Sequence, residues 1–425
     1  MTLDFSKKDN NKIIKSWIFY DWANSAFATT IMATVLPIFY TDIAGSALSK
    51  AKATSYWGYT QSIAMLIVAL MVPVLGAISD FSHLKMRFLK IFAYTGILAT
   101  ASLITVDSGD YILCSLLFIF ASIGFSGGNV FYDSILPEIS TSENIDTISS
   151  KGFAMGYLGG GLLLMINLFI IQFPKLFFFK NTVIATRFTF LTVAVWWFVF
   201  SLPLFKSVRD IKQKVSKDSY VLIGFKRIYN TFKEIKKYKQ LFKFILAFWL
   251  YNDGIGTIIR MATIYGREVG IGKLHLIGAL LLTQFVGIPF SLLFGKIAKR
   301  VGTKKSIYIA ISIYILITTW GFFLNSAFDF WVLAFLVGTV QGGSQALSRS
   351  LYASMVPKKK SSEFFGFLAI SSKFAAVFGP FVFALIAQLT GSSRFGIISL
   401  IAFFILGLIL LSTVNVNEGR KIANN

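Results

Sequence analysis

The chain has 425 residues, of which 55% are hydrophobic and only 14% charged. Water-soluble domains carry about 25% charged residues, so this composition excludes a soluble enzyme and a nucleic-acid-binding protein and indicates a membrane protein with many spans. The formal net charge of +22 fits the same conclusion, because the basic residues lie in short segments between apolar runs, where they set membrane topology.

Twelve segments have the length of a membrane-spanning helix, which needs about 20 mainly apolar residues. An even number of spans places both termini on one side of the membrane. Lysine and arginine are concentrated in the two tails and in the loops after even-numbered spans, so we expect both termini in the cytoplasm. The predicted spans are 17–44, 52–80, 88–106, 109–135, 148–172, 183–205, 241–266, 274–299, 304–324, 328–355, 363–388 and 393–414.

The longest polar interruption separates six spans from six spans. Its apolar residues recur at alternating spacings of three and four, which predicts either an amphipathic helix on the anionic inner leaflet or a solvated linker. Glycine pairs and prolines of the fourth span recur in the tenth, which favours a duplicated bundle. The predicted parts are a tail (1–16), a six-helix bundle (17–205), a basic linker (206–240), a second six-helix bundle (241–414) and a tail (415–425).

Metal centres, disulfides and a cleaved signal peptide are not expected. Cys114 is the only cysteine, and the two histidines, His83 and His275, lie far apart in the sequence. The first sixteen residues mix lysines with acidic residues and lack the apolar stretch that precedes a cleavage site. We therefore predict no metal site and no cofactor.

Ionisable residues at membrane depth are costly unless paired, so they are candidates for function. Asp21 in the first span lies about 9 Å along a helix from Lys15, in the cytoplasmic third of the membrane. Asn129 and Arg349 lie at a comparable depth in the fourth and tenth spans, and Asp133 lies nearer the surface. A carboxylate and guanidinium layer at this depth predicts an inner gate. Permanent helix packing is the alternative.

The loop after the second span carries Gly76, Asp80 and Arg87. The glycine permits close helix approach, Asp80 can meet a neighbouring helix end or cation, and Arg87 anchors the loop at the inner leaflet. A similar loop begins at Gly295 in the second half, with Lys299 at the position that corresponds to Asp80. We therefore expect these loops to contribute to gating, and to do so asymmetrically.

The seventh span carries Asp253 near the membrane midplane and Arg260 seven residues later, about 10 Å along the helix axis and nearly on the same face. We expect this spacing to be too long for a direct salt bridge along a straight helix. Three interpretations stay open. In the first, Asp253 binds the ammonium of a zwitterion and Arg260 binds its carboxylate. In the second, each residue pairs with a residue on another helix, and Lys373 is the partner of Asp253. In the third, Asp253 carries a coupled proton.

Further polar side chains extend the candidate pathway for substrate or proton. Gln341, Gln345 and Arg349 form a stripe on the tenth span that cannot face lipid. This stripe either lines the central cavity or forms hydrogen bonds between helices. Asn24 in the first span and Asn252 in the seventh complete the set.

These motifs resemble the major facilitator superfamily. The run from Gly76 to Arg87 is similar to its loop motif between the second and third spans. Four further segments resemble the subgroup that includes the fungal vacuolar amino-acid effluxers and many bacterial permeases, and the resemblance covers nearly the whole chain. They are Asp21-Trp22-Ala23-Asn24-Ser25-Ala26-Phe27, Tyr251-Asn252-Asp253-Gly254, the run from Gln341 to Ser350, and Glu363-Phe364-Phe365-Gly366 leading to Lys373 and Gly379-Pro380.

The resemblance implies an all-α membrane protein with twelve transmembrane helices that rocks two six-helix halves around a midplane site. It implies a secondary transporter of a small organic solute, with amino acids first and a proton as the candidate coupling ion. Peptides, nucleotides and lipid-linked solutes are alternatives, as is a non-transporting receptor. No enzyme is expected, because P-loop and His-Glu-x-x-His motifs are absent. We expect a monomer in a bacterial inner membrane, with the vacuole second and without a nucleic-acid partner.

Overall fold

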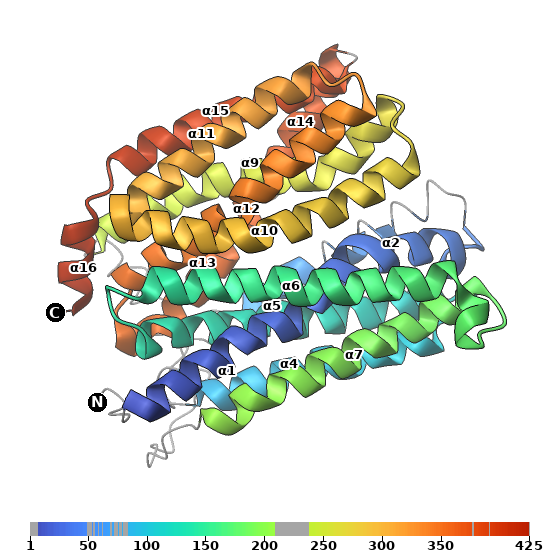
Figure 1. Ribbon diagram of the computed structural model, residues 1–425, viewed down its shortest axis with the longest axis horizontal. Helices are drawn as coiled ribbons and strands as arrows, with labels where there is room; N and C mark the ends of the chain where they lie inside the picture. Colours follow the sequence, from blue (N-terminus) through green and yellow to red (C-terminus); the bar gives the residue numbers. More distant parts are fainter. Residues whose placement is uncertain are drawn as a thin grey trace.

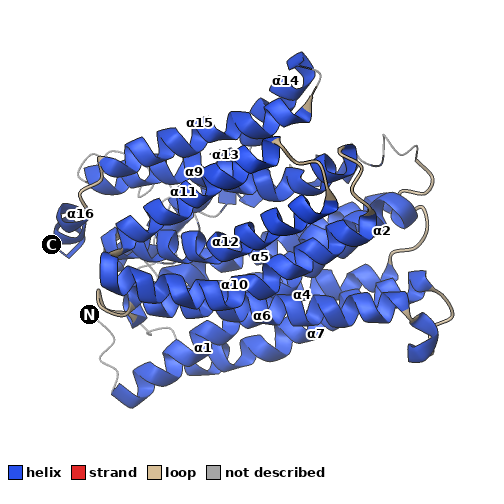
Figure 2. Cartoon of the chain, turned by 45° about the horizontal axis from the view of Figure 1, so that its top comes forward, coloured by secondary structure: helices blue, strands red, loops and turns tan. Residues whose placement is uncertain are grey.

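The computed structural model describes residues 7–48, 84–208, 238–375, 378–390 and 392–424, together with scattered positions between 53 and 79. Across these residues the chain forms helices and no strand. The first half of the chain and the second half form two helical layers, and both termini lie at the same end of the molecule (Figure 1). We call this the termini end and the opposite one the far end. Figure 2 shows the same helices after a 45° turn.

The helices of the first half follow the predicted spans closely. The first span is continuous from Asn11 to Ala44 and contains two π-helical stretches, Phe27–Thr34 and Tyr40–Ala44. The α-helices are α1 (Lys7–Ala26), α2 (Val35–Phe39), α4 (Lys85–Ser102), α5 (Tyr111–Ile139), α6 (Ile145–Gln172) and α7 (Thr182–Ser207). Most of the predicted span 52–80 lies outside the described residues, as do Gly76 and Asp80.

The described residues of the second half also form helices and no strand. Its helices are α9 (Lys239–Glu268), α10 (Lys273–Val301), α11 (Thr303–Phe322), α12 (Ala327–Met355), α13 (Ser361–Ala375), α14 (Phe378–Thr390), α15 (Ser393–Ser412) and α16 (Val416–Asn424). In the described residues, nine helical segments are long and apolar enough to cross a membrane, and two shorter apolar helices accompany them. Residues 209–237 of the predicted linker lie outside the described residues, so the amphipathic helix stays a prediction.

The C-terminal tail is a helix, which hydropathy did not predict. Gln240 at the start of α9 donates its amide to Glu418 at 2.7 Å and accepts from the backbone of Asn415 at 2.8 Å. Arg420 donates to Ser354 at the end of α12 at 3.2 Å. Helix α16 therefore fastens the termini ends of α9 and α12.

Glycine residues allow the helices to approach closely. The hydrophobic effect does not drive helices together within lipid, so van der Waals packing has to stabilise their contacts. On α5, a Cβ at Gly124 would lie 2.3 Å from the backbone nitrogen of Gly96 on α4. The two halves meet along α6 and α10, where a Cβ at Gly295 would lie 2.8 Å from the Ser150 hydroxyl and one at Gly287 3.1 Å from the Tyr157 ring. We call this contact the α6–α10 seam.

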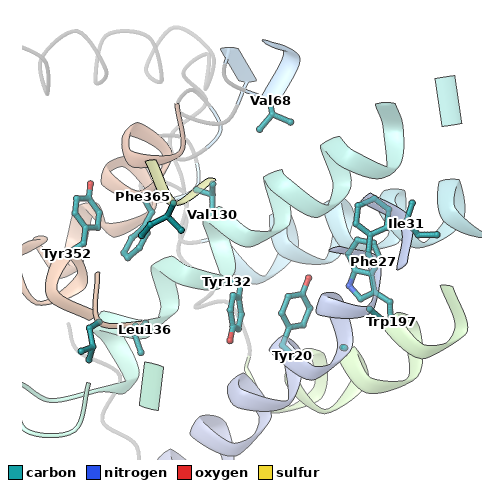
Figure 3. Packing of buried hydrophobic residues seen from close by; sticks show 14 of the residues in the cluster. Tyr20, Phe27, Ile31, Val68, Val130, Tyr132, Leu136, Trp197, Tyr352 and Phe365 are labelled. Atoms are coloured by element: carbon teal, nitrogen blue, oxygen red, sulfur yellow. The ribbon is translucent and has the colours of Figure 1, made fainter. Parts of the chain in front are cut away.

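Large aromatic side chains fill the interior of the first half. Tyr20 and Tyr132 lie with ring centroids 4.9 Å apart, and Phe27, the first residue of the π-helical stretch Phe27–Thr34, lies 5.5 Å from Trp197, so the first span is packed against both α5 and α7 (Figure 3). All four side chains are almost fully buried. This packing fixes the rotation of α1 and therefore the direction in which Asp21 points.

Candidate functional site

A cavity of about 340 Å³ lies between the two halves. Its residues come from α5 and α6 of the first half and from α9, α12 and α13 of the second. Most of the wall is apolar, and the polar groups are amides and hydroxyls with one acid and one base. The lining residues are Phe125, Ser126, Asn129, Val130, Asp133, Phe153, Phe244, Phe248, Asn252, Gln345, Ser348, Arg349, Phe365 and Leu368.

Helical spacing explains how these polar groups reach one wall. Asn129 and Asp133 are four residues apart on α5, and Gln345 and Arg349 are four apart on α12, so each pair projects from one helix face. Helix α12 starts with a capping box, because Ser326 accepts from the backbone of Asp329 at 3.1 Å while the Asp329 carboxylate accepts from the backbone of Ser326 at 3.1 Å. The cap fixes where α12 begins and so helps to set the depth of its polar stripe.

Arg349 joins the halves at the termini end of this cavity. Its Nη1 lies 3.2 Å from Asp133 Oδ1, and its Nη2 lies 3.2 Å from Asp21 Oδ2. Its Nε donates to the hydroxyl of Ser149 and its Nη2 to the carbonyl of Ser149, each at 2.9 Å. Charge-assisted hydrogen bonds of this kind are roughly twice as strong as neutral ones. We call Asp21, Asp133, Ser149 and Arg349 the Arg349 cluster.

Aromatic rings enclose the Arg349 cluster. The guanidinium carbon lies 4.4 Å from the ring centroid of Phe153 and 4.8 Å from that of Trp17. Trp17 in turn stacks on Tyr132 at 4.5 Å. Only 7% of the Arg349 side chain is exposed. Buried charges that lose a partner are strongly destabilising, so this contact is either made completely or replaced by another.

The cluster has room because residue 152 is a glycine. A Cβ at Gly152 would lie 2.4 Å from Asp21 Oδ2 and 2.9 Å from Arg349 Nη2. Neither Gly152 nor Ser149, Phe153 and Trp17 was predicted from the sequence, because small and apolar residues on a spanning helix carry no signal of their own. A helical wheel of α6 places residues 149, 152 and 153 on one face, which is the only sequence signal that groups them.

Asp253 and Arg260 contact each other within α9. Arg260 Nη2 lies 3.8 Å from Asp253 Oδ1, so the expectation that the two are too far apart for an ion pair is wrong. Helical side chains point back toward the N-terminus of their helix, and the long arginine side chain spans the axial distance. The Asp253 side chain is 2% exposed and that of Arg260 is 46% exposed.

Asp253 also forms a hydrogen bond with helix α14. The backbone nitrogen of Gly379, in the first turn of α14, donates to Asp253 Oδ2 at 2.6 Å. A Cβ at Gly379 would lie 2.1 Å from the Thr257 hydroxyl and 2.8 Å from Asp253 Oδ1. Lys373, the other suggested mate of Asp253, belongs to α13, and its side chain lies outside the described residues.

The family profile described as "Vacuole effluxer Atg22 like" matches residues 47–424. The chain belongs to this family. The "Uncharacterized MFS-type transporter YxiO" of Bacillus subtilis (strain 168) is 40% identical over 413 residues, which cover 96% of this chain and 95% of the relative. "Autophagy-related protein 22" of Saccharomyces cerevisiae (strain ATCC 204508 / S288c) is 23% identical over 509 residues, covering 98% and 94%.

The solved structure of the proton:xylose symporter XylE, a major facilitator superfamily protein, superposes with a TM-score of 0.72 at 14% identity, covering 97% of both chains. The match shows a shared fold. This member of the Atg22-like family is therefore a multi-pass membrane transporter with the twelve-helix major-facilitator fold, and it is not an enzyme. The resemblance inferred from the motifs is confirmed.

In this Atg22-like chain, five of the predicted residues line the cavity, and four others lie off its wall. Asn129, Asp133, Asn252, Gln345 and Arg349 are on the wall. Asn24 lies behind it and donates to Asn129 at 2.6 Å. Gln341 is half-buried one turn from Gln345, and Asp253 and Arg260 pair with each other next to Asn252.

A second buried carboxylate links the halves, and sequence reasoning missed it. Thr303 at the start of α11 donates to Asp146 Oδ2 at 2.6 Å, and the Ser350 hydroxyl on α12 donates to Asp146 Oδ1. Asp146 is 8% exposed in the first turn of α6. Aspartate near a helix start is so common that its spacing alone does not distinguish this residue.

Helix α13 adds a third set of contacts at the termini end. Lys85 at the start of α4 forms an ion pair with Glu138 on α5 and donates to Ser361 at 2.5 Å. Ser362 donates to Ser134 at 3.0 Å. Of the predicted loop residues, Arg87 is exposed on α4, and Gly295 belongs to the α6–α10 seam. The contacts of Asp146, Lys85 and Ser362 all lie between the cavity and the termini end.

Proposed function

We propose that this transporter carries a neutral amino acid with an apolar side chain by alternating access, and that the cavity between the halves is its binding site. The observation that carries this proposal is the composition of the wall. Phenylalanines supply an apolar surface for a side chain, while Asp133 and Arg349 offer one charge of each sign for a zwitterion. Asn129, Asn252 and Gln345 add neutral hydrogen-bonding groups.

The size of the cavity supports a single amino acid over larger solutes. Small-molecule sites typically measure about 300–1,000 Å³, and this one, at about 340 Å³, lies at the small end. A nucleotide or a lipid-linked solute requires more room. Five of the fourteen lining residues are phenylalanine, and they give the wall an apolar surface that suits an apolar side chain better than the many hydroxyls of a sugar.

Substrate binding and gating share residues in this scheme. A substrate carboxylate competes with Asp21 and Asp133 for Arg349, and a substrate ammonium competes with Arg349 for Asp133. A ligand shifts a two-state equilibrium only by its differential affinity for the two states. When the substrate replaces Asp21 or Asp133 as the partner of Arg349, it gains affinity for the open state. Substrate binding therefore weakens the ion pairs that hold the two halves together at the termini end.

The direction of opening follows from membrane topology. With both termini in the cytoplasm of a bacterial inner membrane, as the distribution of lysine and arginine predicts, the Arg349 cluster and the Asp146 contacts close the cytoplasmic side. Opening them leads the solute to the cytoplasm, and reforming them returns the cavity to the outside. The description of the family as effluxers favours export as the physiological direction.

Asp253 and Arg260 are the proposed coupling pair. Asp253 is buried, with Oδ1 bonded to no hydrogen-bond donor within the described chain and 3.8 Å from Arg260. Protonation of the carboxylate removes its negative charge and weakens the ion pair with Arg260, so the charge of Asp253 can report the binding of a proton. The Gly379 contact transmits the change to α14.

The test is uptake into liposomes of purified protein, driven by a counter-gradient of each solute in turn. We expect leucine, isoleucine and tyrosine to exchange, and dipeptides, nucleosides and sugars not to exchange. Gln345→Ala should raise the apparent KM for leucine about tenfold through loss of one hydrogen bond to the substrate. Gln341→Ala, one turn away on the same helix and off the cavity wall, is the matched control and should change KM less. Exchange of another solute class alone refutes the proposed substrate and keeps the transporter.

A further inference from the structure

A second hollow lies outside the transport path, between α1 and α7. It has a volume of about 470 Å³ and is lined by Asn11, Lys12, Lys15, Ser16, Phe19 and Pro203. Ser16 and Ser207 share a hydrogen bond of 3.0 Å that bridges the two helices beside it. Both helices belong to the first half, so this groove persists whichever way the halves are tilted.

The groove is positively charged. Lys12 and Lys15 are exposed, and in the part of the chain that the structure describes neither ammonium has an ion-pair or hydrogen-bond partner. Lys206, also exposed, is one turn from Pro203 on α7. No carboxylate occurs among the described residues that line the groove. Two free ammonium groups one helical turn apart form a site for an anion.

An aromatic strip continues from the groove toward the middle of the bundle. Phe19 is 39% exposed and lies 6.4 Å from Phe200. Trp22 stacks on Trp196 at 5.2 Å, and Trp196 lies 4.7 Å from Phe200. Trp22 is seven residues beyond Lys15, which corresponds to about 10 Å along the helix axis. Along this face a charged surface is followed by an aromatic surface, which matches an anionic headgroup followed by an acyl chain.

We propose that this groove binds an anionic phospholipid, with its phosphate on Lys12 and Lys15 and one acyl chain along the aromatic strip. Basic pockets between spanning helices are suited to acidic headgroups. A free phosphate meets the same two lysines and leaves the aromatic strip uncovered, so the strip favours the lipid. A choline headgroup adds a cation beside the two lysines, which favours a headgroup with net negative charge. This inference does not depend on the transported solute.

Binding is measured by native mass spectrometry of the full-length protein in detergent, titrated with phosphatidylglycerol or phosphatidylcholine. We expect phosphatidylglycerol to bind at least about tenfold more tightly. Each lysine near an acidic lipid surface contributes about fivefold in affinity, so Lys12→Gln with Lys15→Gln should weaken phosphatidylglycerol binding about 25-fold. Lys12→Arg with Lys15→Arg should retain it and shows that the paired positions tolerate substitution.

The matched control is Lys358→Gln with Lys359→Gln, which removes two exposed lysines from the turn Lys358–Lys360. It should change phosphatidylglycerol affinity less than twofold. Phe19→Ala should weaken both lipids by a similar factor, because it removes acyl-chain contact. Equal losses in the two glutamine pairs, equal affinity for the two lipids, or complete displacement of phosphatidylglycerol by inorganic phosphate at matched ionic strength would each overturn the proposal.

Discussion

Among the described residues, two aspartate–arginine contacts inside the helix bundle are built in opposite ways. In the Arg349 cluster, one arginine on α12 reaches acids on α1 and α5 and the backbone of α6, and 7% of its side chain is exposed. In α9, Arg260 contacts Asp253 of its own helix at 3.8 Å, and 46% of its side chain is exposed. The first contact joins the halves, whereas the second lies within one.

The difference separates the two tasks that a rocking transporter needs. When the halves tilt, the Arg349 cluster must break, because its members sit on both of them. The Asp253–Arg260 pair travels with α9 and stays intact unless its charge changes. From their positions in the fold we propose gating for the first contact and ion coupling for the second, although both consist of the same two residue types.

The largest effect is expected for Arg349→Ala. It leaves the partly buried carboxylates of Asp21 and Asp133 without their cation, at a cost of up to about 3–5 kcal/mol. We expect liposome exchange to fall about 100-fold or more, and the protein to unfold at a lower temperature. Arg349→Lys keeps the charge and loses the fork geometry, so it should recover part of the stability and little of the exchange. Exchange at the normal rate in Arg349→Ala would break the comparison.

Gly152→Val tests the cluster without removing any charge. The new side chain displaces Asp21 from Arg349, because even its Cβ would lie 2.4 Å from the carboxylate. We expect exchange to fall about tenfold, in line with the 1–3 kcal/mol typical of overpacking. Gly161→Ala, on the same helix with its nearest neighbour 3.3 Å away, is the control and should lose less. Equal exchange rates in Gly152→Val and Gly161→Ala would show that the Arg349 cluster accommodates a side chain at position 152.

Asp21→Asn should open the termini end. Asparagine carries no negative charge, so position 21 no longer forms an ion pair with Arg349. The contact between α1 and α12 is therefore weaker. A reporter cysteine is introduced by Ser348→Cys on the cavity wall, in a chain that also carries Cys114→Ser. Labelling by an impermeant thiol reagent from the cytoplasmic face of inside-out vesicles should rise several-fold. Unchanged labelling would remove Asp21 from the gate.

The smallest effect is expected for the coupling energy between Asp253 and Arg260. Because the arginine is half exposed, solvent screens the pair, and a double-mutant cycle with Asp253→Asn and Arg260→Gln should give about 0–1 kcal/mol in unfolding experiments. Asp253→Asn alone should abolish accumulation driven by a proton gradient and spare exchange. A coupling energy near that of the Arg349 cluster would mean that α9 carries a structural ion pair.

The sequence supported the fold because a spanning helix requires a long apolar run, and such runs are visible one by one. The predicted span 109–135 corresponds to α5, and 328–355 to α12. Ionisable residues at depth were visible for a similar reason. Asp21, Asp133 and Arg349 were grouped by estimated depth alone, and the structure brings them together.

Other parts of the site depend on contacts between helices that no local pattern encodes. Gly152 matters because α1 and α12 meet beside it, and Asp146 because α11 begins opposite it. The contact of Arg260 with Asp253 was missed because the prediction considered only the distance along the helix axis. The length of the arginine side chain, which spans that distance, was not included. Helix α16 was missed because its partners, Gln240 and Ser354, lie far away in the sequence.

The α6–α10 seam has a mechanical consequence. Ser150 and Tyr157 of α6 enter notches that Gly295 and Gly287 leave in α10. The glycines let the two helices approach closely with small contacts, so we expect one helix to roll on the other without separating from it. We propose that α6 stays in contact with α10 throughout the cycle and serves as the axis about which the halves rotate. Each degree of roll moves the distant ends of the bundles most, so a small rotation at the seam is enough to exchange which side of the membrane is sealed.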